Sequence, residues 1–418
     1  MIGVGASGPL AATQPVRALA RPASGERDAW AVLASVRGLG PVGLAALLER
    51  YGSGIAILAE ATSPGGAGRL AETGREPRAD GLPRRRPVNA VLGATIAEAA
   101  GQADRILARI RAIGLDIVTV EEPLYPHRLG AVELPPHVLF VQGDIRVLDP
   151  ARAVAVVGTR RPTLAGRRLA VGIAASIARA GATVVSGLAV GIDGAAHDAT
   201  LTVGGSTIAV IGSGHARLFP RAHTRLAERI AANGGAVVSE LPPDDGATPG
   251  TFPRRNRVIS GLSDATVVVE APARSGALIT ASWSLEQGRE SFLVPGPIGE
   301  PASAGCLSFL REFAGSARIV AGIPQLLDDL GLVDHEAATA VETSPLAEAA
   351  LIDIGGTAGR IGRELVAGRS TVDELVAVTG LPVATVLGAL TLLEGRGLVH
   401  DAYGRYRPTG QLAIVEPG

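Results

Sequence analysis

Between residues 153 and 296, short and wholly apolar runs alternate with longer segments of helical period. The runs are AVAVVG, TVVSG, STIAVIG, AVVSE, ATVVVEA and SFLVPG. Apolar strands that alternate with helices are typical of a parallel sheet covered on both faces. The pattern predicts an α/β fold with an extended, Rossmann-like, mostly parallel sheet at about 150–330. We place this sheet in a domain at 116–334.

The segments before this domain predict a separate helical domain at 27–115. Two apolar helical stretches flank Gly38-Leu39-Gly40-Pro41, and another helix is predicted at 94–113. The first pair resembles a SAM-like helix-hairpin-helix element, whose turn amides can face a phosphate, although an ordinary helical hairpin fits the same letters. Proline, glycine and arginine predict a disordered insertion at about 62–90, and residues 1–26 are predicted to be a disordered tail.

The end of the chain predicts a linker at 335–360 and a winged helix at 361–412. Thr371 and Glu374 stand near the positions of a capping box, and a second helix and the hairpin LVHDAYGRYRP follow. A transcription regulator that reads duplex DNA is one alternative function. However, the second helix, PVATVLGALTLLEGRG, has no arginine or asparagine in its first turns to read bases.

Composition narrows the classes of function. The 418 residues have a formal net charge of -1 and contain no lysine, so all 39 basic residues are arginine. Between 151 and 275, arginine outnumbers aspartate plus glutamate by 14 to 8, which predicts a local basic patch. Cys306 is the single cysteine, so an internal disulfide is excluded. We find no apolar signal peptide, membrane span or nucleotide-loop motif, and therefore expect a cytoplasmic protein without a cofactor or metal.

Ligands of open parallel sheets bind beyond the carboxyl ends of the strands. In this sequence, basic residues gather in the loops that follow the six apolar runs. The arginines at this edge are Arg160, Arg161, Arg221, Arg254, Arg255, Arg257 and Arg274. The turns Ser186-Gly187 and Ser275-Gly276 can present backbone N–H groups to phosphates, and Phe219 and Phe252 can stack on bases. Each arginine is equally well explained as a solvated charge or as an ion-pair partner of Asp244, Asp245 or Glu270. The two phenylalanines are equally well explained as core residues.

Asp193 and His197 lie four positions apart in GIDGAAH, which places them on one helix face. This spacing suits an acid/base pair or half of a metal site. We favour a structural interpretation, a helix cap and a buried hydrogen bond, because nothing in the sequence completes a metal cluster.

Six ordered blocks resemble the DNA-processing protein A (DprA/Smf) family. They are AVVGTRRPT, VVSGLAVGIDGAAHDATL, GGSTIAVIGSG, FPRRNRVISGLSDATVVVEA, SGALITASWSLEQGR and LVPGPIGEPASAG. The resemblance implies a dimeric protein without catalytic turnover that binds and protects single-stranded DNA in natural transformation and loads a RecA-type recombinase. It further implies a phosphate pocket formed by Arg160, Ser186, Gly187, Arg221, Arg254, Asn256 and Arg257.

The chain departs from the family pattern at several positions. Ala165-Gly166 replaces the usual Tyr-Gly, Phe219-Pro220 replaces Tyr-Pro, and His223 and Leu307 stand where asparagine is common. A nucleotide phosphoribohydrolase that uses Glu270 or Asp193 as acid or base is the enzymatic alternative. Its P-G-G-x-G-T-x-x-E loop is missing, since APARSGALITA occupies that place.

Overall fold

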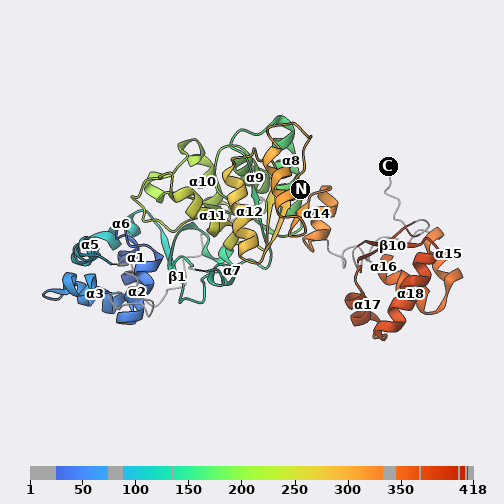
Figure 1. Ribbon diagram of the computed structural model, residues 1–418, viewed down its shortest axis with the longest axis horizontal. Helices are drawn as coiled ribbons and strands as arrows, with labels where there is room; N and C mark the ends of the chain where they lie inside the picture. The colour runs from blue at the N-terminus through green and yellow to red at the C-terminus, as the bar shows by residue number, and fades with distance from the viewer. Residues whose placement is uncertain are drawn as a thin grey trace, which may run out of the picture. The chain divides into compact units, whose positions relative to one another are not determined.

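The computed structural model describes residues 25–73, 88–133, 135–332, 345–366, 369–402, 405–409 and 412. It divides into two compact units, Met1–Ile323 and Pro324–Gly418, which we describe separately (Figure 1). Most of the predicted disordered tail, residues 74–87 of the predicted insertion and residues 335–344 of the predicted linker lie outside the described residues.

The first unit begins with helices in the range for which a helical domain is predicted, and the assignment of a separate helix-hairpin-helix domain stays a prediction. These helices are α1 (Gly25–Ala34), α2 (Pro41–Tyr51), α3 (Gly54–Thr62), α4 (Gly66–Ala71), α5 (Ala90–Gly101) and α6 (Ala103–Ala112). Gly38 adopts a φ of 90° between α1 and α2, as the tight turn requires. The helix predicted at 94–113 is two helices that meet at Gln102, and α4 lies inside the range predicted to be an insertion.

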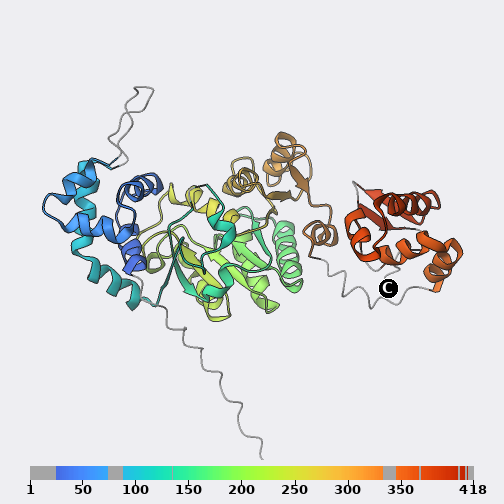
Figure 2. The same ribbon diagram turned by 90° about the horizontal axis from the view of Figure 1, so that it is seen from below.

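A nine-stranded sheet forms the centre of the first unit (Figure 2). The strands are β1 (Asp116–Thr119), β2 (Val138–Gly143), β3 (Ala153–Val157), β4 (Thr183–Ser186), β5 (Thr207–Val210), β6 (Ala236–Ser239), β7 (Ala265–Val268), β8 (Glu290–Leu293) and β9 (Ala317–Ile319). Their order is β1-β2-β6-β5-β4-β3-β7-β8-β9, and only the β1–β2 and β2–β6 pairs in it are antiparallel. All six strands predicted from the apolar runs are confirmed.

Helices cover both faces of the sheet because its strands are apolar on both sides. One layer contains α8 (Leu164–Arg179), α9 (Ile192–Thr202) and α10 (Thr224–Ala232), and the other contains α7 (His127–Gly130), α11 (Thr251–Gly261) and α12 (Gly276–Glu286). Successive side chains of a strand point to opposite faces. Accordingly, Ile208 and Val210 of β5 share a core with Ile259, whereas Ala209 shares one with Ile230.

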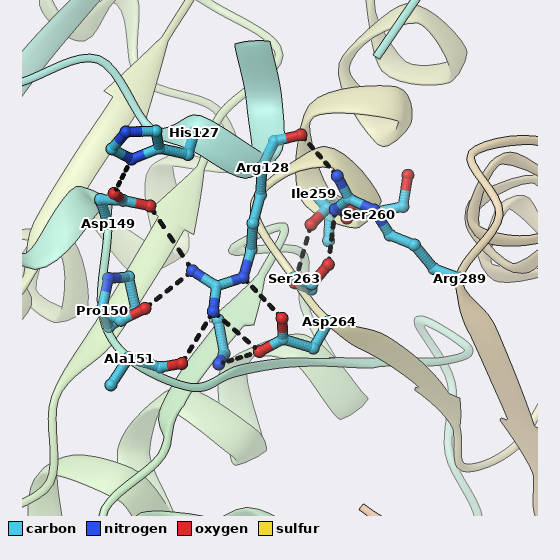
Figure 3. Close-up of polar contacts among 11 residues, drawn as sticks. His127, Arg128, Asp149, Pro150, Ala151, Ile259, Ser260, Ser263, Asp264 and Arg289 are labelled. Atoms are coloured by element: carbon cyan, nitrogen blue, oxygen red, sulfur yellow. Dashed lines mark hydrogen bonds and ion pairs between the residues drawn. The ribbon is translucent and has the colours of Figure 1, made fainter. Parts of the chain in front are cut away.

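The amino ends of β3 and β7 are joined by an arginine cluster (Figure 3). Arg128 donates to the Asp264 carboxylate at 2.6 Å and to the carbonyls of Pro150 and Ala151 at 2.7 and 2.8 Å. Arg289 donates to the carbonyl of Arg128 and to carbonyls at the end of α11. We call Arg128, Arg289 and Asp264 the amino-end cluster.

The chain order creates a switch point at the opposite, carboxyl end of the sheet. From β3 the chain moves through β4 and β5 to β6, and it then returns through α11 to β7, on the other side of β3. The loops after β3 and β7 therefore diverge to opposite faces and leave a crevice between them, which is where open α/β sheets bind ligands.

The second unit consists of short helices and a hairpin. Its elements are α15 (Pro345–Ile354), α16 (Gly356–Val366), α17 (Val372–Thr379), α18 (Val383–Gly395), β10 (Val399–Ala402) and β11 (Arg405–Pro408), after α14 (Ile323–Asp329) at the boundary. The predicted capping box of Thr371 and Glu374 is confirmed at the start of α17. The assignment as a winged helix stays a prediction.

Four further elements lie in the sheet region, the helix α13 (Ala304–Glu312) and the 3-10 turns η1 (Ile145–Leu148), η2 (His215–Arg217) and η3 (Arg221–His223). Within the described residues, no single helix is long and apolar enough to cross a membrane. Two bent pairs, α2 with α3 and α17 with α18, meet that test together by length and composition alone.

Candidate nucleic-acid interface

A cavity of about 570 Å³ opens at the switch point between β3 and β7. Of the residues predicted for the site, it brings together Arg160, Arg161, Arg255, Asn256, Ser275 and Gly276, with Phe252 and Arg274 beside them. Gly187 and Phe219 line a smaller hollow next to it. Ser186, Arg221, Arg254 and Arg257 do not line the cavity.

Backbone contacts fix the position of Arg160. The N–H of the preceding Thr159 donates to the carbonyl of Glu270 at 2.7 Å, and the carbonyl of Thr159 accepts from the N–H of Ile192 at 3.2 Å. Gly191 has a φ of 94°, and a Cβ there would lie 2.4 Å from the Thr159 oxygen. The loops after β3 and β4 thus pack backbone against backbone, and the Arg160 side chain projects from this junction into solvent.

Arg160 belongs to a small aromatic group. Its Cζ lies 5.2 Å from the centroid of the Phe252 ring, within the range of a cation–π contact. The rings of Phe252 and Phe219 are 5.6 Å apart and inclined by 56°. Phe219 is 45% exposed, so part of its ring is accessible to a ligand.

The start of α12 supplies backbone donors to the cavity. The Ser275 side chain caps this helix by accepting from Ala277 N at 3.3 Å, and Gly276 is exposed. Asn256 donates from Nδ2 to the Gly276 carbonyl at 3.0 Å, so α11 holds this turn in place. The first N–H groups of a helix and its dipole favour an anion at such a position.

The three arginines of TFPRRNR have different environments because they lie on one helix, α11. Arg254 and Arg257 are three residues apart and bind Glu240 at 3.1 and 2.6 Å. Arg255 is buried and donates to the Val210 carbonyl at 3.0 Å. Burial lowers the pKa of Arg255 to about 10, while the charge of Asp193 opposes this shift.

Sequence reasoning missed Glu240, the buried carboxylate that receives Arg254 and Arg257. Its position directly after an apolar strand was a possible signal. The carboxylates that we considered as partners have other contacts. Asp244 binds Arg109 at 2.8 Å, and Glu270 accepts from the N–H of Thr163 and, at 2.9 Å, from its hydroxyl.

Ser186 and Asp193 make contacts inside the fold. The Ser186 hydroxyl donates to the Val156 carbonyl at 2.7 Å. Asp193 accepts from Gly187 N at 3.1 Å and from Ala189 N at 3.4 Å, so its carboxylate shapes the loop after β4. Burial raises the pKa of Asp193, and the nearby Arg255 opposes this effect.

His197 is fully buried and its Nδ1 lies 2.7 Å from the Thr207 hydroxyl. Burial lowers the pKa of His197 to about 3, so the imidazole is neutral at physiological pH. The predicted buried hydrogen bond of His197 is confirmed. The predicted helix cap is wrong, because Gly191 is the N-cap of α9 and Asp193 accepts from the loop before the helix. Among the described residues, no group of three or more His, Cys, Asp or Glu side chains is placed to hold a metal ion.

Comparisons with known proteins match the region that contains the cavity. The model of a family described as DNA recombination-mediator protein A matches residues 116–331. Protein Smf of Escherichia coli (strain K12) is 38% identical over 293 residues, which cover 69% of this chain and 76% of the relative. A putative DNA processing protein DprA of Mycobacterium tuberculosis (strain ATCC 25618 / H37Rv) is 40% identical over 275 residues, which cover 65% and 68%.

A solved structure is also similar. The X-ray structure of DNA processing protein A from Streptococcus pneumoniae aligns with a TM-score of 0.57 and 30% sequence identity. The alignment covers 72% of this chain and 97% of that chain. The family match extends from β1 to β9, so it includes every strand of the large sheet.

Proposed function

The chain belongs to the DNA recombination-mediator protein A family, and we propose from this premise that the cavity at its switch point binds single-stranded DNA. One observation carries the proposal. Arg160, Arg161 and Arg274 are exposed around the cavity, and none of the three forms an ion pair with a described carboxylate.

The charge on the cavity wall favours phosphate. Asp193 is the one carboxylate among the lining residues, and it lies buried beside Arg255. The three exposed guanidinium groups are therefore not neutralised locally. Arginine forks and helix N-terminal amides are the donors that bind phosphate oxygens in proteins.

The aromatic group favours a single strand over a duplex. Phe219 is accessible beside Arg160, and unpaired bases can stack on such rings whatever their sequence. The bases of a duplex are stacked on one another and do not offer their faces. We expect binding that tolerates sequence and weakens as salt rises.

We further propose that the protein protects incoming single strands in natural transformation, acts as a homodimer and passes the strand to a RecA-type recombinase. The family resemblance supports these roles. A role without catalysis is supported by the engagement of the acid/base candidates: Glu270 binds Thr163, Asp193 binds the loop after β4, and His197 binds Thr207.

Fluorescence anisotropy with a labelled oligonucleotide, single-stranded or duplex, over a salt series tests the proposal. We expect Arg160→Ala to weaken single-strand binding about 10-fold and to reduce the slope of log K against log salt by about 0.7, the value for one phosphate contact. Arg152→Ala is the matched control, since it removes an exposed arginine from the amino-end edge of β3.

Two results would overturn the proposal. One is equal affinity of the wild type for duplex and single strand. The other is an Arg160→Ala variant that binds as the Arg152→Ala control does.

A further inference from the structure

A second hollow, of about 680 Å³, lies beside the cavity between the first two turns of α8, α9 and α10. We call it the groove, and the residues that concern us are Arg160, Arg167, Asp198, His223 and Arg229. We propose that the groove is a second phosphate subsite, into which a bound strand continues from the cavity. This inference rests on the proposed function of the cavity.

Shared residues join the groove to the cavity. Arg160 lines the cavity, the small hollow and the groove. Phe252 belongs to both the cavity and the small hollow, and Val190 belongs to both the small hollow and the groove. A strand held at the cavity therefore enters the groove by passing the side chain of Arg160.

The groove is electropositive. Arg167 is exposed on α8 and makes no ion pair with a described carboxylate. Arg229 pairs with Asp198 at 2.7 Å, but the two side chains are 52% and 56% exposed, so water weakens the pair. Arg160, Arg167 and Arg229 thus face a single carboxylate in the groove.

The fold orients His223 at the wall of the groove. Its Nδ1 lies 2.9 Å from the carbonyl of Leu188, which has an unusual φ of 58°. The ring packs against Gly194, where a Cβ would lie 2.3 Å from the His223 Cε1. With Nδ1 donating to this carbonyl, Nε2 is the nitrogen that remains for a ligand.

An acidic protein segment is the other polymer that an arginine-lined groove could bind. The continuity through Arg160 favours DNA, because one strand can occupy both hollows at once. Two phosphate subsites on one strand predict that affinity and salt dependence increase with oligonucleotide length.

The test compares oligonucleotides of about 4 and about 16 nucleotides, lengths that span the range of single-strand binding sites. We expect Arg167→Ala in the full-length protein to weaken binding of the longer strand about 10-fold and to lower its salt slope by about 0.7. Binding of the shorter strand is expected to stay unchanged. Arg168→Ala is the matched control, since Arg168 is the adjacent exposed arginine of α8 and does not line the groove.

Each result has a defined meaning. Wild-type protein that binds neither strand refutes the function proposed for the cavity. If the wild type binds both lengths and Arg167→Ala binds each length as Arg168→Ala does, the groove is not a phosphate subsite. The function proposed for the cavity is not affected by that result. An equal loss on both lengths in Arg167→Ala also refutes the groove as a subsite, because that loss reflects a general effect of charge. Arg167→Glu, with a thermal melt to confirm folding, should repeat the length-selective loss with a larger effect.

Discussion

The two ends of the parallel strands use arginine in opposite ways. At the amino ends, the guanidinium groups of Arg128 and Arg289 are surrounded by carboxylate and carbonyl acceptors (Figure 3). At the carboxyl ends, Arg160 and Arg274 are exposed and make no ion pair with a described carboxylate. In a chain whose 39 basic residues are all arginine, the acceptors around each side chain separate the structural arginines from those that we propose to bind a ligand, and residue type does not.

Arg257 lies at the carboxyl ends but has the contacts of a structural residue, so it tests the comparison most severely. Arg257→Ala would leave Glu240 buried without this partner, since their side chains are only 8% and 7% exposed. We expect the free energy of unfolding in urea to fall by about 3–5 kcal/mol. Arg254→Ala, which removes a 43% exposed partner of the same carboxylate, should cost less than about 1 kcal/mol. Equal losses in the two variants would contradict the distinction.

The amino-end cluster provides the next prediction. Arg128→Ala removes several charge-assisted hydrogen bonds, and we expect the free energy of unfolding to fall by about 2–4 kcal/mol. Binding of single-stranded DNA below the unfolding transition should equal that of the wild type, because the cluster lies at the far end of the strands. An Arg128→Ala variant that is fully stable yet binds DNA weakly would reverse the roles of the two edges.

Histidines also differ between the edges, which allows a smaller test by pH. His127 beside the amino-end cluster is 86% exposed, whereas burial lowers the pKa of His215, after β5, to about 4. The unfolded chain binds a proton at His215 near pH 6.5 and the folded chain does not, so the stability from this residue is complete above pH 6.5 and is lost as the pH falls toward 4.

Between pH 6.5 and pH 5, His215 should lower the free energy of unfolding of the wild type by about 2 kcal/mol. We expect His215→Gln to lack this part of the pH dependence. Urea unfolding of both proteins at the two pH values measures this difference. The other buried histidine and Asp193 are present in both proteins, so their contributions cancel. Parallel pH dependence in the two proteins would contradict a neutral His215.

The sequence predicted the strands of the large sheet well because their signal is local. Each of the six runs is apolar on both faces and leads into a small-residue loop, and a parallel sheet requires both features. The three-residue β9 carries no such signal, since Ala317 and Arg318 are only partly buried and Ile319 is exposed. Helix α4 was missed because glycine fills a range that looks like a loop.

The partners of the arginines could not be predicted in the same way. TFPRRNR shows three neighbouring cations, but only the helical phase of α11 sends Arg254 and Arg257 toward Glu240 and Arg255 toward Val210. The contact between Arg109 and Asp244 joins residues 135 positions apart, which no local pattern reveals. The edge of the sheet that carries the cavity was predicted, because ligands of open parallel sheets bind beyond the carboxyl ends of the strands, but the wall of the cavity depends on these distant contacts.

The backbone junction at Thr159 has a consequence for how binding occurs. Hydrogen bonds to Glu270, just after β7, and from Ile192 of α9 hold this residue on both sides, and the missing side chain of Gly191 lets the loops after β3 and β4 pack in direct contact. The entropy of ordering this part of the receptor is lost during folding and not during association. Under the proposed function, the DNA strand adapts its shape to the protein, and we expect flexible sequences, rather than ones with particular bases, to be captured most readily.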